Sequence, residues 1–206
     1  MKTFYALLVS ATALAGGYGA TAAQAEETKK AIFAGGCFWC VEKDFDHVPG
    51  VLKTISGYIG GNTDSPTYQN HSAGRHREAV EITYDPEKVT YTQLLNVFWR
   101  SVDPTDAGGQ FCDRGHSYTT AIYGIGEEQL KQAAASKEEL ETSGVLKAPV
   151  AISVEEAGIF WPAEDYHQDY YKKNPTRYKL YRFGCGRDRK VVSVWGDQAH
   201  AGIAPH

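Results

Sequence analysis

Two cysteines spaced three residues apart, Cys37 and Cys40, are the residues whose type and spacing point most directly to chemistry. They follow a short apolar stretch at 30–34 and two glycines, a pattern that predicts a buried strand leading into a helix over 37–46. A thiol in the first turn of a helix lies at the positive end of the helix dipole, which favours the thiolate. We therefore predict that Cys37 is a nucleophile.

Cys40 shares a helix face with Cys37, because side chains three residues apart are neighbours on a helix. Such a pair can form a disulfide with little backbone movement, so the spacing predicts a redox-active dithiol. A single C-x-x-C pair also fits two buried cysteines, a structural bridge or half of a zinc site. Cys112 and Cys185 stand alone along the chain, whereas a structural zinc site usually has two close pairs, so no metal is expected.

Several short motifs follow one another in a fixed order along the chain. They are G-C-F-W at 36–39, G-G-N-T-D-S-P-T-Y at 60–68, H-R-E-A-V at 76–80, D-P-T at 103–105, Q-F-C-D-R-G-H-S-Y at 110–118 and A-E-D-Y-H-Q at 163–168. This series resembles the peptide methionine sulfoxide reductase A family over about residues 31–174. The match extends through many motifs in the same order and is therefore highly specific.

The resemblance implies that Cys37 attacks the sulfur of a methionine sulfoxide and that Glu78 protonates the sulfoxide oxygen. An acid working near neutral pH needs a raised pKa, which partial burial beside aromatic side chains supplies. The products are methionine and a sulfenic acid on Cys37. By resemblance, the substrate is the S-epimer, free or in a protein, and the reaction uses no metal or organic cofactor.

The resemblance also identifies residues that line the site. Tyr68 and Tyr118 match hydroxyl donors that hold the sulfoxide oxygen, and Asp113 matches a carboxylate that supports them. Phe38 and Trp39 match the apolar pocket for the S-methyl group. Taken singly, each residue also fits an ordinary place in a core, a turn or a surface ion pair. Their order along the chain is what favours a site.

A second thiol must condense with the sulfenic acid on Cys37, and two candidates stay open. Cys40 is favoured by its proximity along the chain, whereas Cys185 lies between two glycines that would let a loop swing towards the site. Cys112 ranks third, because a residue next to an inward-facing one in an extended segment usually points away. Residues 182–188 do not resemble the family's Gly-rich tail, which leaves the recycling route open.

The elements that must position these residues alternate between extended and helical patterns. Strands are predicted near 30–34, 51–58, 78–84, 119–125 and 150–154, with extended structure again from Tyr181 onwards, including 191–194; helices are predicted near 37–46, 90–100, 127–141 and 163–172. Neither a repeat nor a Pro-rich linker divides them. The sequence therefore predicts one α+β domain, a mixed sheet with helices packed on it.

Residues 1–25 have the pattern of a cleaved secretory signal: one lysine, an apolar run too short to cross a bilayer, and A-x-A at 23–25. An uncleaved membrane anchor is the alternative. We expect an exported protein, periplasmic or secreted, with no membrane span after processing, a reductase domain over 26–195 and a mobile tail over 196–206. Its reductant would then be an exported thioredoxin-like partner. A net charge of −4 disfavours nucleic acid as a partner.

The sequence thus predicts a thiol-dependent methionine sulfoxide reductase that repairs oxidative damage through an intramolecular disulfide. Two alternatives belong to other functional classes. One is a thiol-disulfide oxidoreductase that uses the Cys37/Cys40 pair, and the other is a secreted binding domain stabilised by disulfides.

Overall fold

The computed structural model describes Met1 and residues 27–205, so the predicted signal segment lies outside the described residues except for Met1. The strands are β1 (Lys29–Gly35), β2 (Val51–Ile59), β3 (Arg77–Tyr84), β4 (Gly109–Gln110), β5 (Asp113–Arg114), β6 (Thr120–Gly124), β7 (Ser153–Glu156) and β8 (Trp161–Pro162). The helices are α1 (Phe38–Asp46), α2 (Tyr91–Trp99), α3 (Gly126–Thr142), α4 (Tyr170–Lys173), α5 (Pro175–Cys185) and α6 (Arg187–Trp195), and 3-10 turns lie at His116–Tyr118 and Gly196–Gln198.

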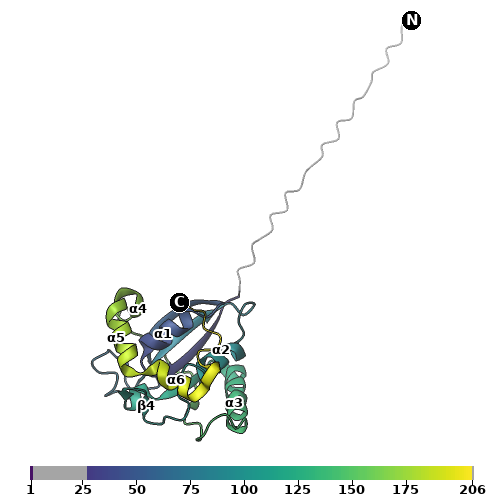
Figure 1. The fold of residues 1–206 in the computed structure, drawn as a ribbon. Coiled ribbons are helices and arrows are strands. Elements are labelled where there is room, and N and C mark those ends of the chain that lie inside the picture. Colours follow the sequence, from purple (N-terminus) through teal and green to yellow (C-terminus); the bar gives the residue numbers. More distant parts are fainter. Residues whose placement is uncertain (2–26, 206) are drawn as a thin grey trace.

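Six strands form one mixed sheet in the order β7-β6-β1-β3-β2-β8, and β4 and β5 form a separate two-stranded ribbon. The pairs are antiparallel except β6 with β7, which is parallel. Figure 1 shows α4 and α5 at one edge of the fold and α3 at the other. This arrangement confirms the predicted α+β class and the single domain.

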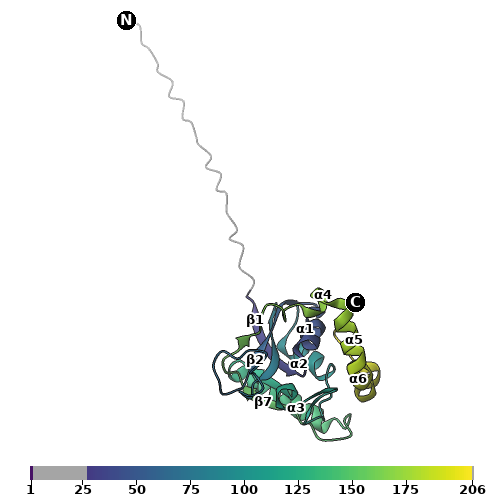
Figure 2. The same cartoon turned by 90° about the vertical axis from the view of Figure 1, so that its left-hand side faces the viewer.

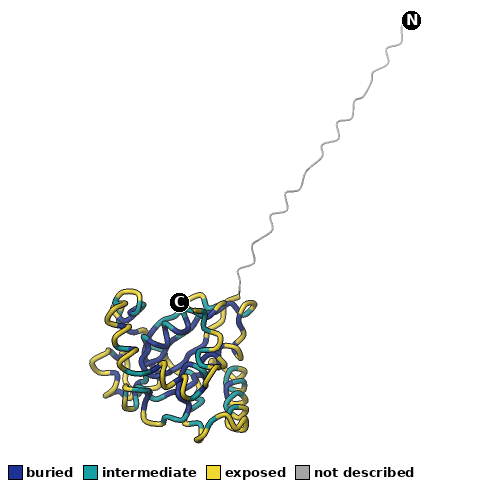
Figure 3. The backbone as a smooth tube through the Cα atoms, viewed as in Figure 1, coloured by how far each residue is buried: buried dark blue, intermediate teal, exposed yellow. Residues whose placement is uncertain are grey.

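The core lies between the central strands and the helices α1 and α2. Phe33 of β1 stacks on Phe45 of α1 and on Phe98 of α2, with ring centroids 5.3 and 4.8 Å apart. In Figure 2 the helices α5 and α6 lie on the far side of α1 from the strands. Figure 3 shows buried residues concentrated on these strands and on α1. The layered packing holds the start of α1 rigidly at the end of β1.

Gly36 makes the turn from β1 into α1. Its φ of +82° lies in the left-handed region, which costs other residues energy, and a Cβ there would lie 2.6 Å from Cβ of Gln110. The predicted strand-to-helix junction is present, with Cys37 at the N-cap of α1.

The C-terminal third differs from the sequence prediction. The extended structure predicted from Tyr181 is wrong, because Tyr181 lies in α5 and residues 191–194 lie in α6. Val191 and Trp195 are buried, and their spacing of four residues matches a helix face. The β-branched valines suggested a strand, but packing on one helix face overrode that propensity.

The helix predicted over 163–172 is also largely wrong. Only Tyr170–Lys173 is helical; Pro175 does lie beyond the end of this helix, as predicted, but it also begins a further helix, α5. Pro is favoured in the first turn, where no backbone N–H is needed for a hydrogen bond. The strand predicted near 150–154 begins later, at Ser153.

Residues 196–205, for which the sequence predicts a mobile tail, lie against the domain. The His200 N–H donates to the Arg100 carbonyl at 2.9 Å, and the Ala204 N–H donates to the His47 carbonyl at 2.8 Å. Ile203 packs against the core. Among the described residues, no helix combines the length and apolar character that crossing a membrane requires.

Candidate active site

A small cavity of about 50 Å³ collects the residues that the sequence assigned to the reaction. They come from five parts of the chain: the start of α1, the loop before β3, β3 itself, the β5 ribbon with the turn after it, and α5. The lining residues are Cys37, Phe38, Trp39, Tyr68, Glu78, Asp113, Tyr118 and Tyr181. Of the predicted site residues, only the candidate resolving cysteines Cys40 and Cys185 do not line this cavity.

Cys37 lies at the N-cap of α1 and is only 6% exposed. Its carbonyl accepts hydrogen bonds from the N–H groups of Cys40 and Val41, which closes the first helical turn over the thiol. Burial raises the pKa of the Cys37 thiol well above its usual value, and the neighbouring Cys40 and Glu78 raise it further. The predicted thiolate is therefore not favoured in the substrate-free site, because loss of solvation outweighs the helix dipole.

The pKa of Cys40 shifts in the opposite direction. A hydrogen bond from Cys37 lowers the pKa of Cys40 to about 7, with help from the positive charges of Arg187 and Arg182. The two thiols titrate as a pair, so the first proton leaves near neutral pH and its loss hinders the second. Cys40 is the member of the pair that carries this first negative charge.

Glu78 is 2% exposed and accepts a hydrogen bond from the backbone N–H of Phe38 at 3.0 Å. Its side chain therefore lies beside the residue that follows Cys37. Burial raises the pKa of Glu78 to about 8, and the nearby charge of Asp113 acts in the same direction. At neutral pH the carboxyl group is largely protonated, as the role of a general acid requires.

Two tyrosines face this carboxyl group from different loops. The Tyr118 hydroxyl is hydrogen-bonded to Glu78, whereas Tyr68 is 39% exposed at the rim. Burial raises the pKa of both phenols, and the charge of Glu78 raises each further. Both hydroxyls therefore stay neutral and can donate a hydrogen bond to an oxygen held beside Glu78.

Tyr181 is the cavity residue that sequence reasoning missed. Its hydroxyl donates a hydrogen bond to Oδ2 of Asp113 and is also hydrogen-bonded to Cys37. Burial raises the pKa of Asp113, while the Tyr181 hydrogen bond opposes that rise. If residues 175–185 had been predicted to form a helix, Tyr181 would have been placed one turn before Cys185. That position would have made it a candidate site residue.

Phe38 and Trp39 form the apolar wall, and neighbouring rings fix their orientation. Phe38 is 1% exposed. The Trp39 indole N–H donates to Nδ1 of His167 at 3.0 Å, and its ring stacks on Tyr170 with centroids 3.7 Å apart. Burial lowers the pKa of His167, which keeps the ring neutral and able to accept this bond. His167 thus supports the tryptophan.

The four cysteines divide into a buried free pair and a disulfide. Cys37 and Cys40 are free, whereas Cys112 is bonded to Cys185 across 73 residues of sequence. Cys185 ends α5, so the mobile loop expected around it is absent. Asp113 and this cysteine pair are the one cluster of metal-ligand type found in the described part of the chain, and the disulfide occupies both sulfurs.

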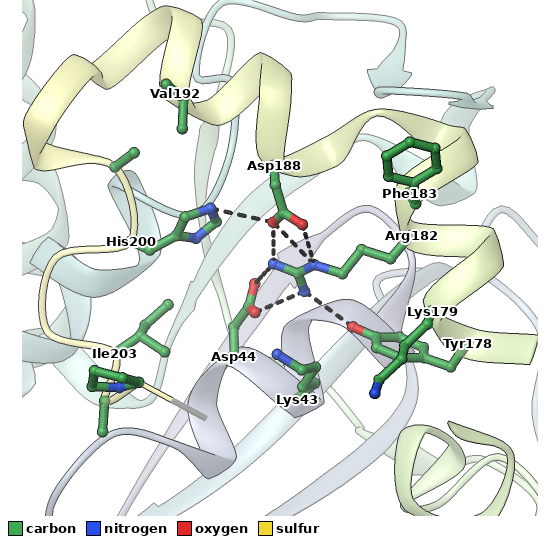
Figure 4. A pocket seen from close by; sticks show the side chains of 13 residues that line it. Lys43, Asp44, Tyr178, Lys179, Arg182, Phe183, Asp188, Val192, His200 and Ile203 are labelled. Atoms are coloured by element: carbon green, nitrogen blue, oxygen red, sulfur yellow. Dashed lines mark hydrogen bonds and ion pairs between the residues drawn. The ribbon is translucent and has the colours of Figure 1, made fainter. Parts of the chain in front are cut away.

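A larger cavity, about 580 Å³, lies elsewhere, between α1, α5, α6 and the C-terminal segment. Figure 4 shows the Arg182 guanidinium there between Asp44 and Asp188, with the closest N–O contacts at 2.8 and 2.6 Å. His200 lies 3.3 Å from Asp188, at the edge of this ion cluster. The cluster pairs Arg182 with carboxylates of α1 and α6. This ion cluster joins α5 to α1 and lies near Cys40.

Comparison with known proteins gives a consistent result. A family model described as peptide methionine sulfoxide reductase matches residues 29–199. Peptide methionine sulfoxide reductase MsrA 2 of Rhizobium meliloti is 56% identical over 182 residues, which cover 88% of this chain and 91% of that protein. The MsrA protein of Bacillus licheniformis is 53% identical over 175 residues, with coverage of 84% and 96%.

A solved structure agrees as well. Methionine sulfoxide reductase A of Corynebacterium diphtheriae has a TM-score of 0.66 and 34% identity, over 74% of this chain and 77% of that one. The chain belongs to the peptide methionine sulfoxide reductase A family, and it is therefore an oxidoreductase that reduces methionine sulfoxide.

Proposed function

We propose that Cys37 takes the oxygen from the S-epimer of methionine sulfoxide, free or within a protein, and that Glu78 is the acid for this step. One observation carries the assignment: the Phe38 N–H donates to Glu78 at 3.0 Å, so a buried acid lies beside the residue that follows the nucleophile. The two residues are far apart in sequence, and only the junction of β1, β3 and α1 brings them together.

The net reaction transfers one oxygen atom from the substrate sulfur to the Cys37 sulfur. Glu78 gives its proton to the sulfoxide oxygen while the Cys37 sulfur attacks the substrate sulfur, and Glu78 recovers a proton from the Cys37 thiol. The bond between the two sulfur atoms and the substrate S–O bond then break as the hydroxyl group passes to the Cys37 sulfur. The thioether leaves, and Cys37 becomes a sulfenic acid. Tyr68 and Tyr118 donate hydrogen bonds to the oxygen during this change, and Asp113 supports the site by accepting a hydrogen bond from Tyr181.

Phe38 and Trp39 accept the S-methyl group of the substrate. The cavity they line is small, and the hydrogen bond from Trp39 to His167 fixes the indole ring as an apolar wall on one side of it. An apolar contact of this kind favours the methyl group over a polar substituent. The resulting substrate is a methyl sulfoxide.

Cys40 resolves the sulfenic acid by attacking the Cys37 sulfur, which forms a disulfide and releases water. Three features support Cys40 over Cys185. Cys40 is free and hydrogen-bonded to Cys37, its pKa of about 7 makes the thiolate accessible near neutral pH, and Cys185 is already bonded to Cys112. A dithiol reductant then restores the pair by thiol–disulfide exchange.

The site of action is part of the same proposal. Residues 1–25 carry the pattern of a signal segment, and we infer from it that the mature chain works outside the cytosol, in the periplasm or the medium. Its reductant is then an exported thioredoxin-like protein. N-terminal sequencing of the exported chain tests this: a mature start at Glu26 supports export, and an intact Met1 in the cytosolic fraction contradicts it.

Intact mass measurement tests the reaction. Reduced protein is mixed with a peptide that contains one methionine S-sulfoxide, and a parallel sample contains the R-epimer. Loss of one oxygen from the S-peptide, with loss of two hydrogens from the protein, supports the proposal. A thiol-disulfide oxidoreductase would change disulfides and leave the peptide oxygen in place, and a binding domain would change neither.

A further inference from the structure

The Cys112–Cys185 disulfide has no part in the proposed reaction, yet it lies beside the active site. Cys112 immediately precedes Asp113, which lines the cavity, and Cys185 lies one helical turn after Tyr181, which also lines it. The Cys112 N–H is 3.1 Å from the Cys185 sulfur. The disulfide therefore joins the two segments that carry Asp113 and Tyr181.

Asp113 and Tyr181 touch each other across the same junction. The Tyr181 hydroxyl donates a hydrogen bond to the Asp113 carboxylate and is hydrogen-bonded to the nucleophile Cys37. This makes a chain of contacts from Asp113 through Tyr181 to Cys37. A shift between the ribbon and α5 would break the chain at the tyrosine.

β4 and β5 pair through only two residues each and form no part of the main sheet. The ribbon is anchored to the domain through buried Gln110, which is hydrogen-bonded to Asp103, whereas the disulfide and the Tyr181–Asp113 hydrogen bond join it to α5. Phe111 on this ribbon has a φ of 56° and packs under the Arg187 guanidinium at 4.8 Å. The opposite segment, α5, is fixed to α1 through Arg182 and Asp44. The disulfide is thus the covalent link between a short ribbon outside the main sheet and a helix that an ion pair fixes to α1.

We propose that Cys112 and Cys185 are positioning residues, whose disulfide holds Asp113 against Tyr181 and so keeps the Tyr181 hydroxyl on Cys37 during oxygen transfer. This inference rests on the proposed function of Cys37. The disulfide acts through the geometry of the cavity and exchanges no electrons with the substrate. Reduction of the disulfide loosens the ribbon and slows the reductase step.

The expected loss follows from the contact that the disulfide protects. One hydrogen bond to a reacting group contributes enough to change a rate by roughly tenfold. We therefore expect the variant Cys112→Ser/Cys185→Ser to reduce a methionine sulfoxide peptide roughly tenfold more slowly in a single turnover. The apparent dissociation constant of the peptide stays unchanged, because the apolar wall of Phe38 and Trp39 is intact.

A double-mutant cycle with Tyr181→Phe distinguishes positioning from general stabilisation. If the disulfide acts through the tyrosine hydroxyl, removing both causes no greater rate loss than Tyr181→Phe alone. Tyr171→Phe is the matched control, since that hydroxyl contacts Asp46 on α1 and lies outside the cavity, so its effect adds to that of the disulfide. The proposal is overturned if the rate losses of Tyr181→Phe and of Cys112→Ser/Cys185→Ser are additive. An unchanged rate in the double serine variant also overturns it.

The wild-type chain supplies a measurement that does not depend on the folding of a variant. Single-turnover rates are compared for two forms of the folded protein. In the first form the Cys112–Cys185 disulfide is intact and two thiols are free, and in the second form the disulfide is reduced and four thiols are free. Unchanged tryptophan fluorescence verifies the fold. Equal rates overturn the positioning role and leave the proposed function standing. If neither form reduces the peptide, both the proposed function and this inference fail.

Discussion

The pH dependence of oxygen transfer tests the role of Glu78 directly. Burial raises the pKa of this carboxyl group to about 8, so the acid is protonated below that pH and loses its proton above it. The protonated fraction is about nine-tenths at pH 7 and about one-tenth at pH 9. The single-turnover rate constant should therefore fall about tenfold between these pH values. The sign is the reverse of that for a general base, whose rate rises with pH.

The matching substitution is Glu78→Gln, which keeps a hydrogen-bonding side chain but has no proton to give. We expect the single-turnover rate constant to fall by about 10²- to 10⁴-fold, the scale of general-acid catalysis, while substrate binding changes little. Any residual rate should lose its dependence on pH near 8. Glu81→Gln is the control, because Glu81 lies on the same strand but pairs with Lys30.

The assay mixes excess reduced enzyme with a methionine sulfoxide peptide, quenches with acid and measures the reduced peptide by mass spectrometry. Excess enzyme removes recycling from the measurement, so the rate reports oxygen transfer alone. A Glu78→Gln rate within a few-fold of wild type, or a wild-type rate that does not fall from pH 7 to 9, would refute the assignment of Glu78 as the acid.

Three further outcomes follow from the cysteines. Cys37→Ser should fold but reduce no peptide, since a serine hydroxyl is not appreciably ionised at neutral pH, and multiple-turnover assays check this. With thioredoxin as reductant, the Cys40→Ser variant should complete one turnover and then stop. Peptide mapping checks this: a Cys37–Cys185 bridge together with normal recycling contradicts the assignment of Cys40. Reducing the Cys112–Cys185 disulfide, which spans 73 residues, should lower the free energy of unfolding by up to about 4 kcal/mol, as urea titration with and without reductant would show; an unchanged midpoint contradicts this.

The sequence alone predicted which residues share the candidate site and most of the N-terminal fold. The apolar stretch at 30–34 and the two glycines before Cys37 predicted the strand-to-helix junction, and the structure has it between Gly35 and Phe38. The ordered motifs predicted that Tyr68, Glu78 and Asp113 share one site, and all three line one cavity. Local signals sufficed here, because glycine conformation and side-chain periodicity specify the backbone over a few residues.

The tertiary structure alone decided which residues meet across long distances. Sequence spacing could not pair Cys112 with Cys185, nor bring Tyr181 to Cys37, because both contacts depend on how α5 packs against α1 and the ribbon. The valines near the C-terminus fitted a strand by propensity, and burial of Val191 on one face made them a helix.

The protonation of the site was also decided by packing. The helix dipole, which can be predicted from sequence, favours a thiolate at Cys37, but burial raises the pKa of that thiol. The same burial raises the pKa of Glu78 and keeps it a proton donor. Desolvation depends on every atom around a group. The sequence and its family resemblance could therefore predict a nucleophile and an acid, whereas the pKa shifts of Cys37 and Glu78 depend on the folded structure.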